Sequence, residues 1–238
     1  MVKTSIVVPV HNQLRYTKQL LDTLLAVSPP DELIVIDNAS TDGTWGYIHS
    51  LPNHGTVTII HRDQNYGFGD AMNYGLSIAR HECLVLLSND VKIVTADWLD
   101  EIRRAVEQNP NALFGAQVVT DNPCTLLSNG ENLLYMAGWV LAFSRATCDK
   151  LAPDGELFDP RFGLAYYEDV DLSRRALGLG VKLHALPELG VLHYGGKTAF
   201  SPNTVHPLGS QLATLRHSRQ QYADKWGCEW AYVKGLDE

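Results

Sequence analysis

The chain has 238 residues, which is enough for one domain with a substantial buried core. Apolar residues make up 45% of it and charged residues 19%, a balance that is typical of a globular protein and excludes a disordered or fibrous chain. The formal net charge of −8 argues against broad electrostatic binding to nucleic acid or to an anionic membrane.

Short apolar runs alternate with amphipathic segments through the first half of the chain. Runs that are apolar at nearly every position are typical of strands covered on both faces, so the alternation predicts an α/β fold with a mostly parallel sheet and flanking helices. Ligands of such sheets bind beyond the carboxyl ends of the strands, which selects residues 10–12, 37–38 and 88–90. The predicted strands are 4–10, 33–36, 57–61 and 83–87, and the predicted helices are 17–27, 45–51, 69–80 and 98–106.

The second half of the chain is less regular. Its predicted segments are strands at 113–120 and 139–144, a loop at 121–132, helices at 146–151 and 169–179, extended runs at 181–185 and 191–194, and a helix within 208–226. The sequence contains no repeat and no clear linker. We therefore expect a single domain over residues 1–238, in which the halves 1–118 and 119–238 share one core.

The cysteines and the apolar segments indicate in which cellular compartment the protein is expected. The four cysteines are widely spaced and include no CxxC pair, which argues against a disulfide framework or a structural zinc site. The segment from Met1 leads directly into a strand-like run, without the layout of a signal peptide. The apolar runs of the sequence are too short to span a bilayer. We expect a cytoplasmic protein, which could still act beside a membrane as a peripheral protein.

Two carboxylates follow buried strands at the edge where ligands bind. Asp90 comes directly after the fourth strand, where it either binds a divalent ion that bridges phosphate oxygens or caps the next segment. Asp37 ends the second strand and could accept hydrogen bonds from a ribose hydroxyl or a base N–H group. Because Ser40, Thr41 or Asp42 can cap the following helix, we expect Asp37 to be free for binding.

The second half carries an acidic cluster and a histidine of interest. The helix dipole favours acids at a helix start, so the cluster at 168–171 is either a structural feature or the source of a general base. Helical spacing places Glu168 and Asp171 on one face and Asp169 on another. His193 is followed by two glycines that permit a ligand to approach closely, and it is either a packed histidine or a metal ligand.

Taken together and in order, four stretches resemble the family 2 glycosyltransferases, which have the GT-A fold, a Rossmann-like sheet flanked by helices. They are similar, in turn, to the opening strand of that family, its nucleotide-binding turn, its donor helix with the metal motif, and its base motif with the metal histidine. The bacterial rhamnosyltransferase-like members are the nearest resemblance. The stretches are 5–12 (SIVVPVHN), 32–44 (ELIVIDNASTDGT), 65–73 (NYGFGDAMN) with 84–90 (LVLLSND), and 167–172 (YEDVDL) with Arg175 and His193.

The resemblance implies roles for individual residues. It implies that Asp90 and His193 bind Mg²⁺ or Mn²⁺ on the donor diphosphate. Asp169 is implied as the general base, with Glu168 beside the acceptor. It also implies that Gly138 and Trp139 lie near the point where an acceptor enters. The implied donor-binding residues are Pro9, Val10, His11, Asn12, Asp37, Asn65, Gly67, Asn73, Ser88 and Asn89.

The activity that this resemblance implies is an inverting transfer of a sugar from a UDP- or dTDP-sugar to an acceptor hydroxyl, on a glycan or a lipid-linked molecule. Family members often carry more acid in the metal motif than Ser88-Asn89-Asp90 does, and an aromatic ring where this chain has His11. An inactive relative that only binds nucleotide sugar is therefore one alternative. The other is a nucleotidyltransferase of similar architecture, although the glycine-rich loop and lysine expected after its first strand are missing. The sequence leaves the oligomeric state open.

Overall fold

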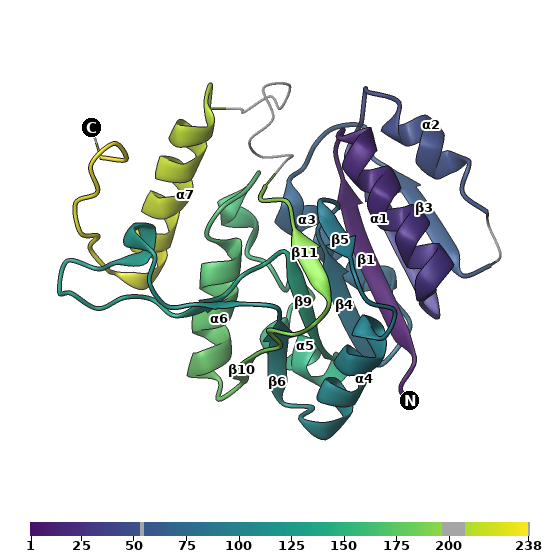
Figure 1. The fold of residues 1–238 in the computed structure, drawn as a ribbon. Coiled ribbons are helices and arrows are strands. Elements are labelled where there is room, and N and C mark those ends of the chain that lie inside the picture. The colour runs from purple at the N-terminus through teal and green to yellow at the C-terminus, as the bar shows by residue number, and fades with distance from the viewer. Residues whose placement is uncertain (53–54, 197–207, 238) are drawn as a thin grey trace.

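The computed structural model describes residues 1–52, 55–196 and 208–237, and it has the predicted fold class, a central sheet between layers of helices (Figure 1). Within these ranges the strands are β1 (Thr4–Val10), β2 (Glu32–Asp37), β3 (Val57–His61), β4 (Cys83–Leu87), β5 (Val91–Ile93), β6 (Ala112–Gly115), β7 (Val118–Val119), β8 (Tyr135–Met136), β9 (Val140–Ser144), β10 (Lys182–Ala185) and β11 (Val191–His193). The helices are α1 (Leu14–Val27), α2 (Thr44–His49), α3 (Phe68–Ile78), α4 (Trp98–Gln108), α5 (Arg145–Leu151), α6 (Glu168–Gly178) and α7 (Gln211–Trp226), with 3₁₀ turns at Pro123–Thr125 and Pro160–Phe162.

The central sheet has seven strands in the order β10-β6-β9-β4-β1-β2-β3. Strands β3, β2, β1 and β4 run parallel, as predicted, and so do β6 and β10. The strand between these two groups, β9, is antiparallel to both β4 and β6. The strand predicted at 113–120 is instead two strands, because β6 belongs to the central sheet whereas β7 pairs with β8. An apolar run in the sequence does not indicate where a strand ends and the next one pairs with a different sheet.

Alternate residues of the central strands pack against opposite layers of helices. In β1, Ile6 and Val8 belong to the cluster that α1, α2 and α4 cover, whereas Val7 belongs to the cluster covered by α3, α5 and α6. Side chains of a strand alternate between its two faces, so a run covered on both sides must be apolar throughout. Each fully buried Val or Ile in these clusters contributes about 1.5–3 kcal/mol to folding.

The register of the parallel strands aligns their carboxyl ends. Val10 lies opposite Asp37 across the β1–β2 pair, and Val7 lies opposite Leu86 across the β1–β4 pair. The polar residues that follow these three strands therefore leave the sheet at one edge. This edge is where a site is expected in a parallel α/β sheet.

Helix α7 packs beside α6, beyond the β6–β10 end of the sheet (Figure 1). An aromatic cluster joins them, with the buried rings of Phe162, Tyr167 and Tyr222 at its centre. Among the helices of the described residues, none has the length and apolar character needed to cross a membrane.

Candidate active site

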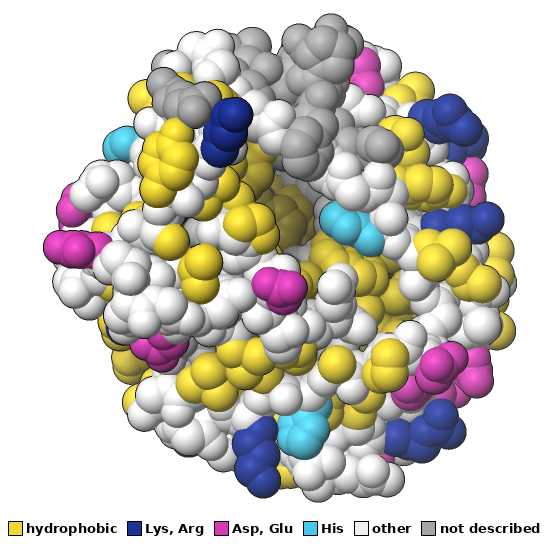
Figure 2. Space-filling view, turned by 60° about the vertical axis from the view of Figure 1, so that its left-hand side comes forward, with side chains coloured by type: hydrophobic (Ala, Val, Ile, Leu, Met, Phe, Trp, Pro, Cys, Tyr) yellow, Lys and Arg dark blue, Asp and Glu magenta, His cyan; other side chains and the backbone are white. Residues whose placement is uncertain are grey.

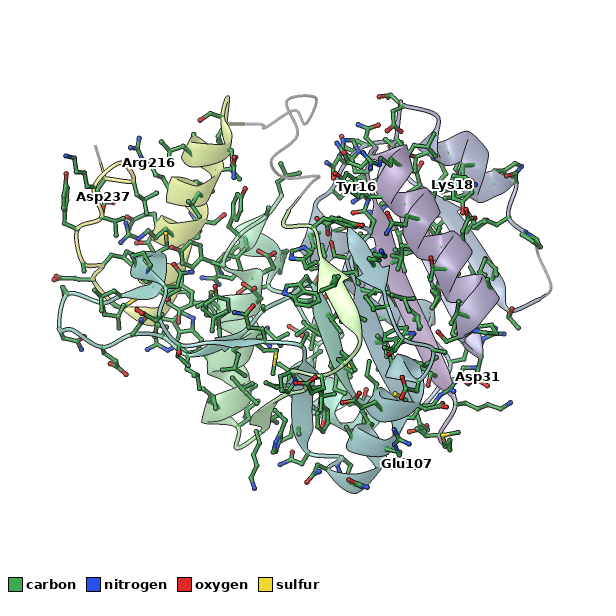
Figure 3. The ribbon with its side chains drawn as sticks, viewed as in Figure 1. Tyr16, Lys18, Asp31, Glu107, Arg216 and Asp237 are labelled. Atoms are coloured by element: carbon green, nitrogen blue, oxygen red, sulfur yellow. The ribbon has the colours of Figure 1, made fainter. Side chains whose placement is uncertain are left out.

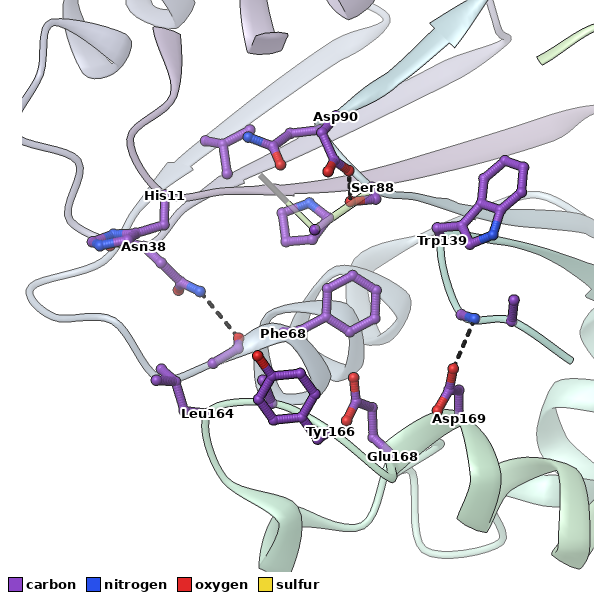
Figure 4. Close-up of a pocket in the computed structure, with 18 of the residues that line it drawn as sticks. His11, Asn38, Phe68, Ser88, Asp90, Trp139, Leu164, Tyr166, Glu168 and Asp169 are labelled. Carbon is purple, nitrogen blue, oxygen red and sulfur yellow. Dashed lines mark hydrogen bonds between the residues drawn. The ribbon is translucent and has the colours of Figure 1, made fainter. Parts of the chain in front are cut away.

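A cavity of about 360 Å³ opens at the carboxyl ends of β1, β2 and β4. This volume is in the range of sites that bind small molecules. One side of the cavity, the sheet edge, consists of residues 9–11, 38 and 88–90. The other side, the opposite wall, consists of residues 164–166, 168 and 169. Figure 2 shows a hollow with hydrophobic side chains inside it, and Figure 4 shows labelled side chains of both sides around the cavity.

Most of the predicted site residues line this cavity. They come from both halves of the sequence, so the cavity is formed by segments that are distant along the chain. The predicted residues that it brings together are Pro9, Val10, His11, Asn65, Gly67, Ser88, Asn89, Asp90, Gly138, Trp139, Glu168, Asp169 and His193.

Asp37 is not among the residues that line the cavity, and the expectation that it is free for binding is wrong. Its side chain is fully buried, Oδ1 accepts a hydrogen bond from the Ser40 backbone N–H at 3.2 Å, and Oδ2 lies 2.6 Å from His61 Nδ1. The carboxylate thus stabilises the turn after β2, a common role of Asp in turns. Asp42 lies one residue before Gly43, the N-cap of α2, and its Oδ1 accepts from the backbone N–H of Thr44 at 3.1 Å.

Asn12 and Asn73 also have structural partners in place of the predicted contact with the cavity. Asn12 Oδ1 accepts from the backbone N–H of Thr41 at 2.7 Å, which ties the loop after β1 to the loop after β2. The side chain of Asn73 makes two hydrogen bonds with the backbone of Phe158, at 2.7 and 2.9 Å. Both amides therefore position the loops around the cavity.

His11 and Asn38 form the part of the sheet edge that follows β1 and β2. His11 Nδ1 lies 2.6 Å from the carbonyl oxygen of Asn38, and His11 Nε2 lies 3.2 Å from Asn12 Nδ2. A carbonyl oxygen only accepts and an amide nitrogen only donates, so these two contacts hold the His11 ring in one orientation. Asn38 Nδ2 donates to the Gly67 carbonyl at 3.0 Å, and its buried Oδ1 has no partner in the described part of the protein. A hydrogen-bond donor from a ligand would satisfy this oxygen.

Asp90 and His193 lie together at the other part of the sheet edge. His193 Nε2 is 3.1 Å from Asp90 Oδ1, because β11 pairs with β5 directly after the loop that carries Asp90. The Ser88 hydroxyl donates to the same carboxylate oxygen at 2.6 Å. The Trp139 ring stacks on the His193 ring with 4.9 Å between centroids and 6° between planes, and this contact restricts the imidazole.

The chemistry of Asp90 and His193 fits a divalent ion whose other ligands come from the substrate. A carboxylate oxygen and an imidazole nitrogen are both ligands of Mn²⁺, and Mg²⁺ also binds carboxylates. Within residues 1–52, 55–196 and 208–237, no group of three or more His, Cys, Asp or Glu side chains is arranged to bind an ion. Such a two-ligand arrangement is usual where substrate phosphates complete the coordination of Mg²⁺.

Glu168 and Asp169 begin α6 and both face the cavity (Figure 4). The backbone N–H of Gly138 donates to Asp169 Oδ2 at 3.0 Å. A Cβ atom at Gly138 would lie 3.0 Å from Asp169 Cβ, so the absence of a side chain allows this approach. Glu168 Oε2 is buried, and it has no hydrogen-bond partner among the residues that the structure describes.

The expected grouping of Glu168 with Asp171 is wrong. Asp171 is fully buried and points away from the cavity, where its Oδ2 accepts from Arg175 Nε at 2.9 Å. The helix starts only after Tyr167, whose φ of 68° turns the chain sharply. The first two helical residues, Glu168 and Asp169, line the cavity, whereas Asp171 contacts Trp226 of α7.

The environment of the two carboxyl groups separates their proton affinities. Burial, together with the charge of Asp169, raises the pKa of Glu168 to about 8. Burial raises the pKa of Asp169 to about 6, although the backbone N–H groups of Gly138 and Val170 act in the opposite direction. Neighbouring carboxylates repel each other, so the pair keeps one proton near neutral pH. At that pH Asp169 can accept a proton and Glu168 can donate a hydrogen bond.

Several residues that line the cavity have no role implied by the family resemblance. Asn38 lies within the strand end at 37–38 that the sheet-edge rule selects, and Tyr166 has a usable signal because it adjoins the acidic motif. Others are apolar residues or glycine without chemical signature, and only the fold reveals them. The additional lining residues are Asn38, Phe68, Tyr135, Ala137, Leu164, Ala165, Tyr166 and Gly196.

The family described as Glycosyl transferase family 2 matches residues 5–166, which is more than half of the chain. The chain belongs to glycosyl transferase family 2. The match confirms the resemblance stated above, and it ends two residues before the acidic pair that opens α6.

Curated relatives of this family 2 member match a little less than half of it. A PGL/p-HBAD biosynthesis glycosyltransferase of Mycobacterium bovis is 33% identical over 118 residues, which is 48% of this chain and 46% of the relative. The succinoglycan biosynthesis protein ExoO of Rhizobium meliloti is 31% identical over 102 residues, 43% of this chain and 27% of the relative. The chain spans less than half the length of these relatives.

Solved structures establish the fold of this family 2 member as GT-A. The mannosyltransferase PcManGT of Pyrobaculum calidifontis, in complex with GDP-Man and Mn²⁺, has a TM-score of 0.63 at 18% identity, over 79% of this chain and 55% of its own. GalNAc-T7, with UDP, GalNAc and Mn²⁺, has a TM-score of 0.64 at 13% identity, over 97% of this chain and 56% of its own. At these identities the likeness shows the fold alone.

Proposed function

We propose that this chain is an inverting glycosyltransferase that moves a sugar from a nucleoside-diphosphate donor to an acceptor hydroxyl, with Asp169 as general base. One observation carries the proposal: the carboxyl groups of Glu168 and Asp169 face the same cavity as Asp90 and His193. The family membership of the chain supports the same reaction class.

In the proposed reaction, Asp169 accepts the proton of the acceptor hydroxyl while that oxygen attacks the anomeric carbon. The attack comes from the face opposite the leaving diphosphate, so the anomeric configuration inverts. The backbone N–H of Gly138 donates to Asp169 Oδ2 and orients the carboxylate. The other oxygen, Oδ1, accepts from the backbone N–H of Val170, and we propose that it takes the incoming proton. A positioned base of this kind contributes about 10²–10⁴-fold to the rate.

Asp90 and His193 are the residues that would bind Mg²⁺ or Mn²⁺. When bound, the ion supplies positive charge that stabilises the leaving diphosphate. The Ser88 hydroxyl orients the Asp90 carboxylate, and the Trp139 ring orients His193. We propose that the residues of 1–118 mainly bind the donor and those of 119–238 mainly bind the acceptor, within one catalytic domain.

The donor and acceptor classes are proposed from the relatives. The structural neighbours were solved with GDP-Man, with UDP and GalNAc, and with UDP-GlcNAc, which supports a nucleotide sugar, and we propose UDP- or dTDP-sugars first. The names of two curated relatives refer to PGL/p-HBAD and succinoglycan biosynthesis, which supports a lipid-linked or glycan acceptor. Such an acceptor is consistent with a cytoplasmic enzyme that contacts a membrane peripherally.

A second candidate function is a protein that binds nucleotide sugar without transferring the sugar, and one feature of the site favours it. The metal motif contains one carboxylate, and the described residues provide two ligands at this site, Asp90 and His193. Weak ion binding would then leave the diphosphate charge poorly stabilised.

The test is a panel of nucleotide sugars incubated with the protein and Mn²⁺, with release of nucleoside diphosphate as the readout. An enzyme hydrolyses its donor slowly without acceptor, whereas a binding protein releases nothing. The Asp169→Asn variant is the matched control, because it keeps the shape of the side chain and removes the base. We expect it to bind nucleoside diphosphate normally and to lose transfer by about 10²-fold or more. Near-normal transfer by a folded Asp169→Asn protein would falsify the base assignment.

A further inference from the structure

Helix α7 contacts α6 from the side away from the cavity, through Asp171. The fully buried Asp171 carboxylate lies two residues after the proposed base. Its Oδ1 accepts a hydrogen bond from Trp226 Nε1 at 2.9 Å and pairs with Lys225 Nζ at 2.7 Å. The last two residues of α7 therefore bind the first turn of α6, in a part of the chain beyond the family match at residues 5–166.

Lys225 makes a second ion pair at the start of the segment that leads to the opposite wall. Its Nζ lies 2.7 Å from Asp159 Oδ2, and the Lys225 side chain is 17% exposed. Nearer the start of α7, the Ser218 hydroxyl donates to the carbonyl oxygen of Ala165, which lines the cavity, at 2.8 Å. Helix α7 is thus attached at both ends of the segment from Asp159 to Asp171.

The first turn of α6 lacks a cap of its own, which makes these contacts important. The residue before the helix, Tyr167, gives no side-chain hydrogen bond to it, although helices commonly begin with such a cap. Instead, Asp171 connects this turn to Arg175 within α6 and to Lys225 and Trp226 of α7. The direction of the Asp169 side chain depends on how this turn is oriented.

We infer that Lys225 and Trp226 are positioning residues for sugar transfer: through Asp171 they fix the start of α6, and with it the carboxylate of Asp169. The inference rests on the proposed function, because it needs Asp169 to be the base. Under this inference α7 contributes to the chemical step and not to donor binding. The reason is that the contacts of α7 lie behind the opposite wall and not at the sheet edge. A displacement of about 1 Å at a catalytic group can reduce a rate 10²-fold.

Four variants test this role. Lys225→Met removes both ion pairs at nearly constant length, and Lys225→Arg restores a cation that can reach both carboxylates. Trp226→Phe removes the indole N–H and keeps a ring beside the guanidinium of Arg174, which lies 4.4 Å from the Trp226 ring. Lys18→Met is the control, because it removes an exposed ion pair of 3.0 Å on α1, away from α7 (Figure 3).

The measurements are kcat and donor KM for the nucleotide sugar that the wild-type protein turns over fastest, and the affinity for the matching nucleoside diphosphate with Mn²⁺. We expect Lys225→Met and Trp226→Phe to lower kcat about tenfold, with donor KM and nucleotide affinity within about twofold of wild type. Lys225→Arg should recover most of kcat, and Lys18→Met should match wild type. A merely structural role would instead lower the fraction of protein that binds nucleotide.

The outcomes separate this inference from the proposed function. A wild-type kcat in folded Lys225→Met and Trp226→Phe proteins, beside an inactive Asp169→Asn protein, overturns the positioning role alone. Loss of nucleotide binding in parallel with kcat, without recovery in Lys225→Arg, also overturns it. If Lys225→Met does not fold, Trp226→Phe decides. If wild type releases no nucleoside diphosphate, the proposed function fails and this inference fails with it.

Discussion

The sheet edge and the opposite wall of the cavity are built in different ways. The sheet edge consists of short loops that directly follow β1, β2 and β4, and their positions are set by the register of neighbouring strands. The opposite wall follows a long irregular segment and is positioned by contacts with α7 and with the loop before α3. A site can thus combine one side fixed by local sheet geometry with another fixed by distant side chains, and the two sides should respond differently to substitution.

The largest effect is expected at the sheet edge, for Asp90→Asn. The loss of this carboxylate leaves His193 as the only protein ligand that we propose for the ion, so transfer should fall by about 10²-fold and nucleotide binding should no longer depend on Mn²⁺. Titration of nucleoside diphosphate with and without Mn²⁺ measures this. Asp37→Asn is the contrast, since a buried turn carboxylate should affect the melting temperature and not the Mn²⁺ dependence. Equal Mn²⁺ dependence in wild type and Asp90→Asn would contradict the metal assignment.

A second prediction concerns the point where the two sides touch. Gly67 has a φ of 98°, and a Cβ atom there would lie 2.4 Å from the Gly163 carbonyl oxygen, whereas Gly130 has a φ of 82° with open space around it. Both Gly→Ala changes incur the strain of a positive φ, about 1–2 kcal/mol. Gly67→Ala should lower the free energy of unfolding by about 1–3 kcal/mol more than Gly130→Ala, because of the clash. Urea unfolding measures the difference, and equal losses would mean that residues 163–164 move aside freely.

The two carboxyl groups of the opposite wall should make kcat depend on pH. Below its pKa of about 6 Asp169 carries a proton and cannot accept another, so kcat should fall as pH is lowered through that value. Between pH 7 and pH 5 the loss should be about tenfold. Above the Glu168 pKa of about 8 the second proton leaves, and we expect a smaller decline on that side.

Glu168→Gln distinguishes the two limbs of this profile. A neutral amide cannot ionise, so the decline at high pH should disappear while the rise near pH 6 remains. An unchanged decline in the Glu168→Gln protein would assign that limb to another group.

The smallest effect is expected for Gly138→Ala. Its Cβ atom would lie 3.0 Å from Asp169 Cβ and 3.3 Å from Oδ2, so the carboxylate must shift by a few tenths of an ångström. We expect kcat to fall several-fold, about threefold to tenfold, with donor KM unchanged. Gly46→Ala, where nothing lies within 4 Å of the added atom, is the matched control. A wild-type kcat in Gly138→Ala would show that the position of Asp169 tolerates this displacement.

The sequence predicts the sheet edge well, because its information is local. Uniformly apolar runs identify β1, β2 and β4, and the polar residues that follow them must meet at one edge of a parallel sheet. Asn12 and Asp37 are exceptions on this side, because neither lines the cavity, and the reason is clearest for Asp37. Its partner His61 lies 24 residues later at the end of β3, and a pairing at that distance is not visible in the local pattern.

The opposite wall was only partly predictable, for the same reason. The acidic cluster was visible, but the direction of each acid depends on the turn at Tyr167 and on partners in α7, 54 residues beyond Asp171 in the case of Lys225. Leu164 and Ala165 carry no chemical signature at all. The antiparallel direction of β9 was also missed, because strand pairing depends on the whole chain and not on one apolar run.

The central position of β9 has a consequence for how substrates enter and leave. Its backbone bonds with β4 on one side and β6 on the other make one continuous ladder across both halves of the chain. A rigid-body hinge motion that separates β9 from β4 or from β6 would have to break this ladder, so we expect the sheet to move as one body. For the same reason the halves cannot be exchanged between family members as independent modules.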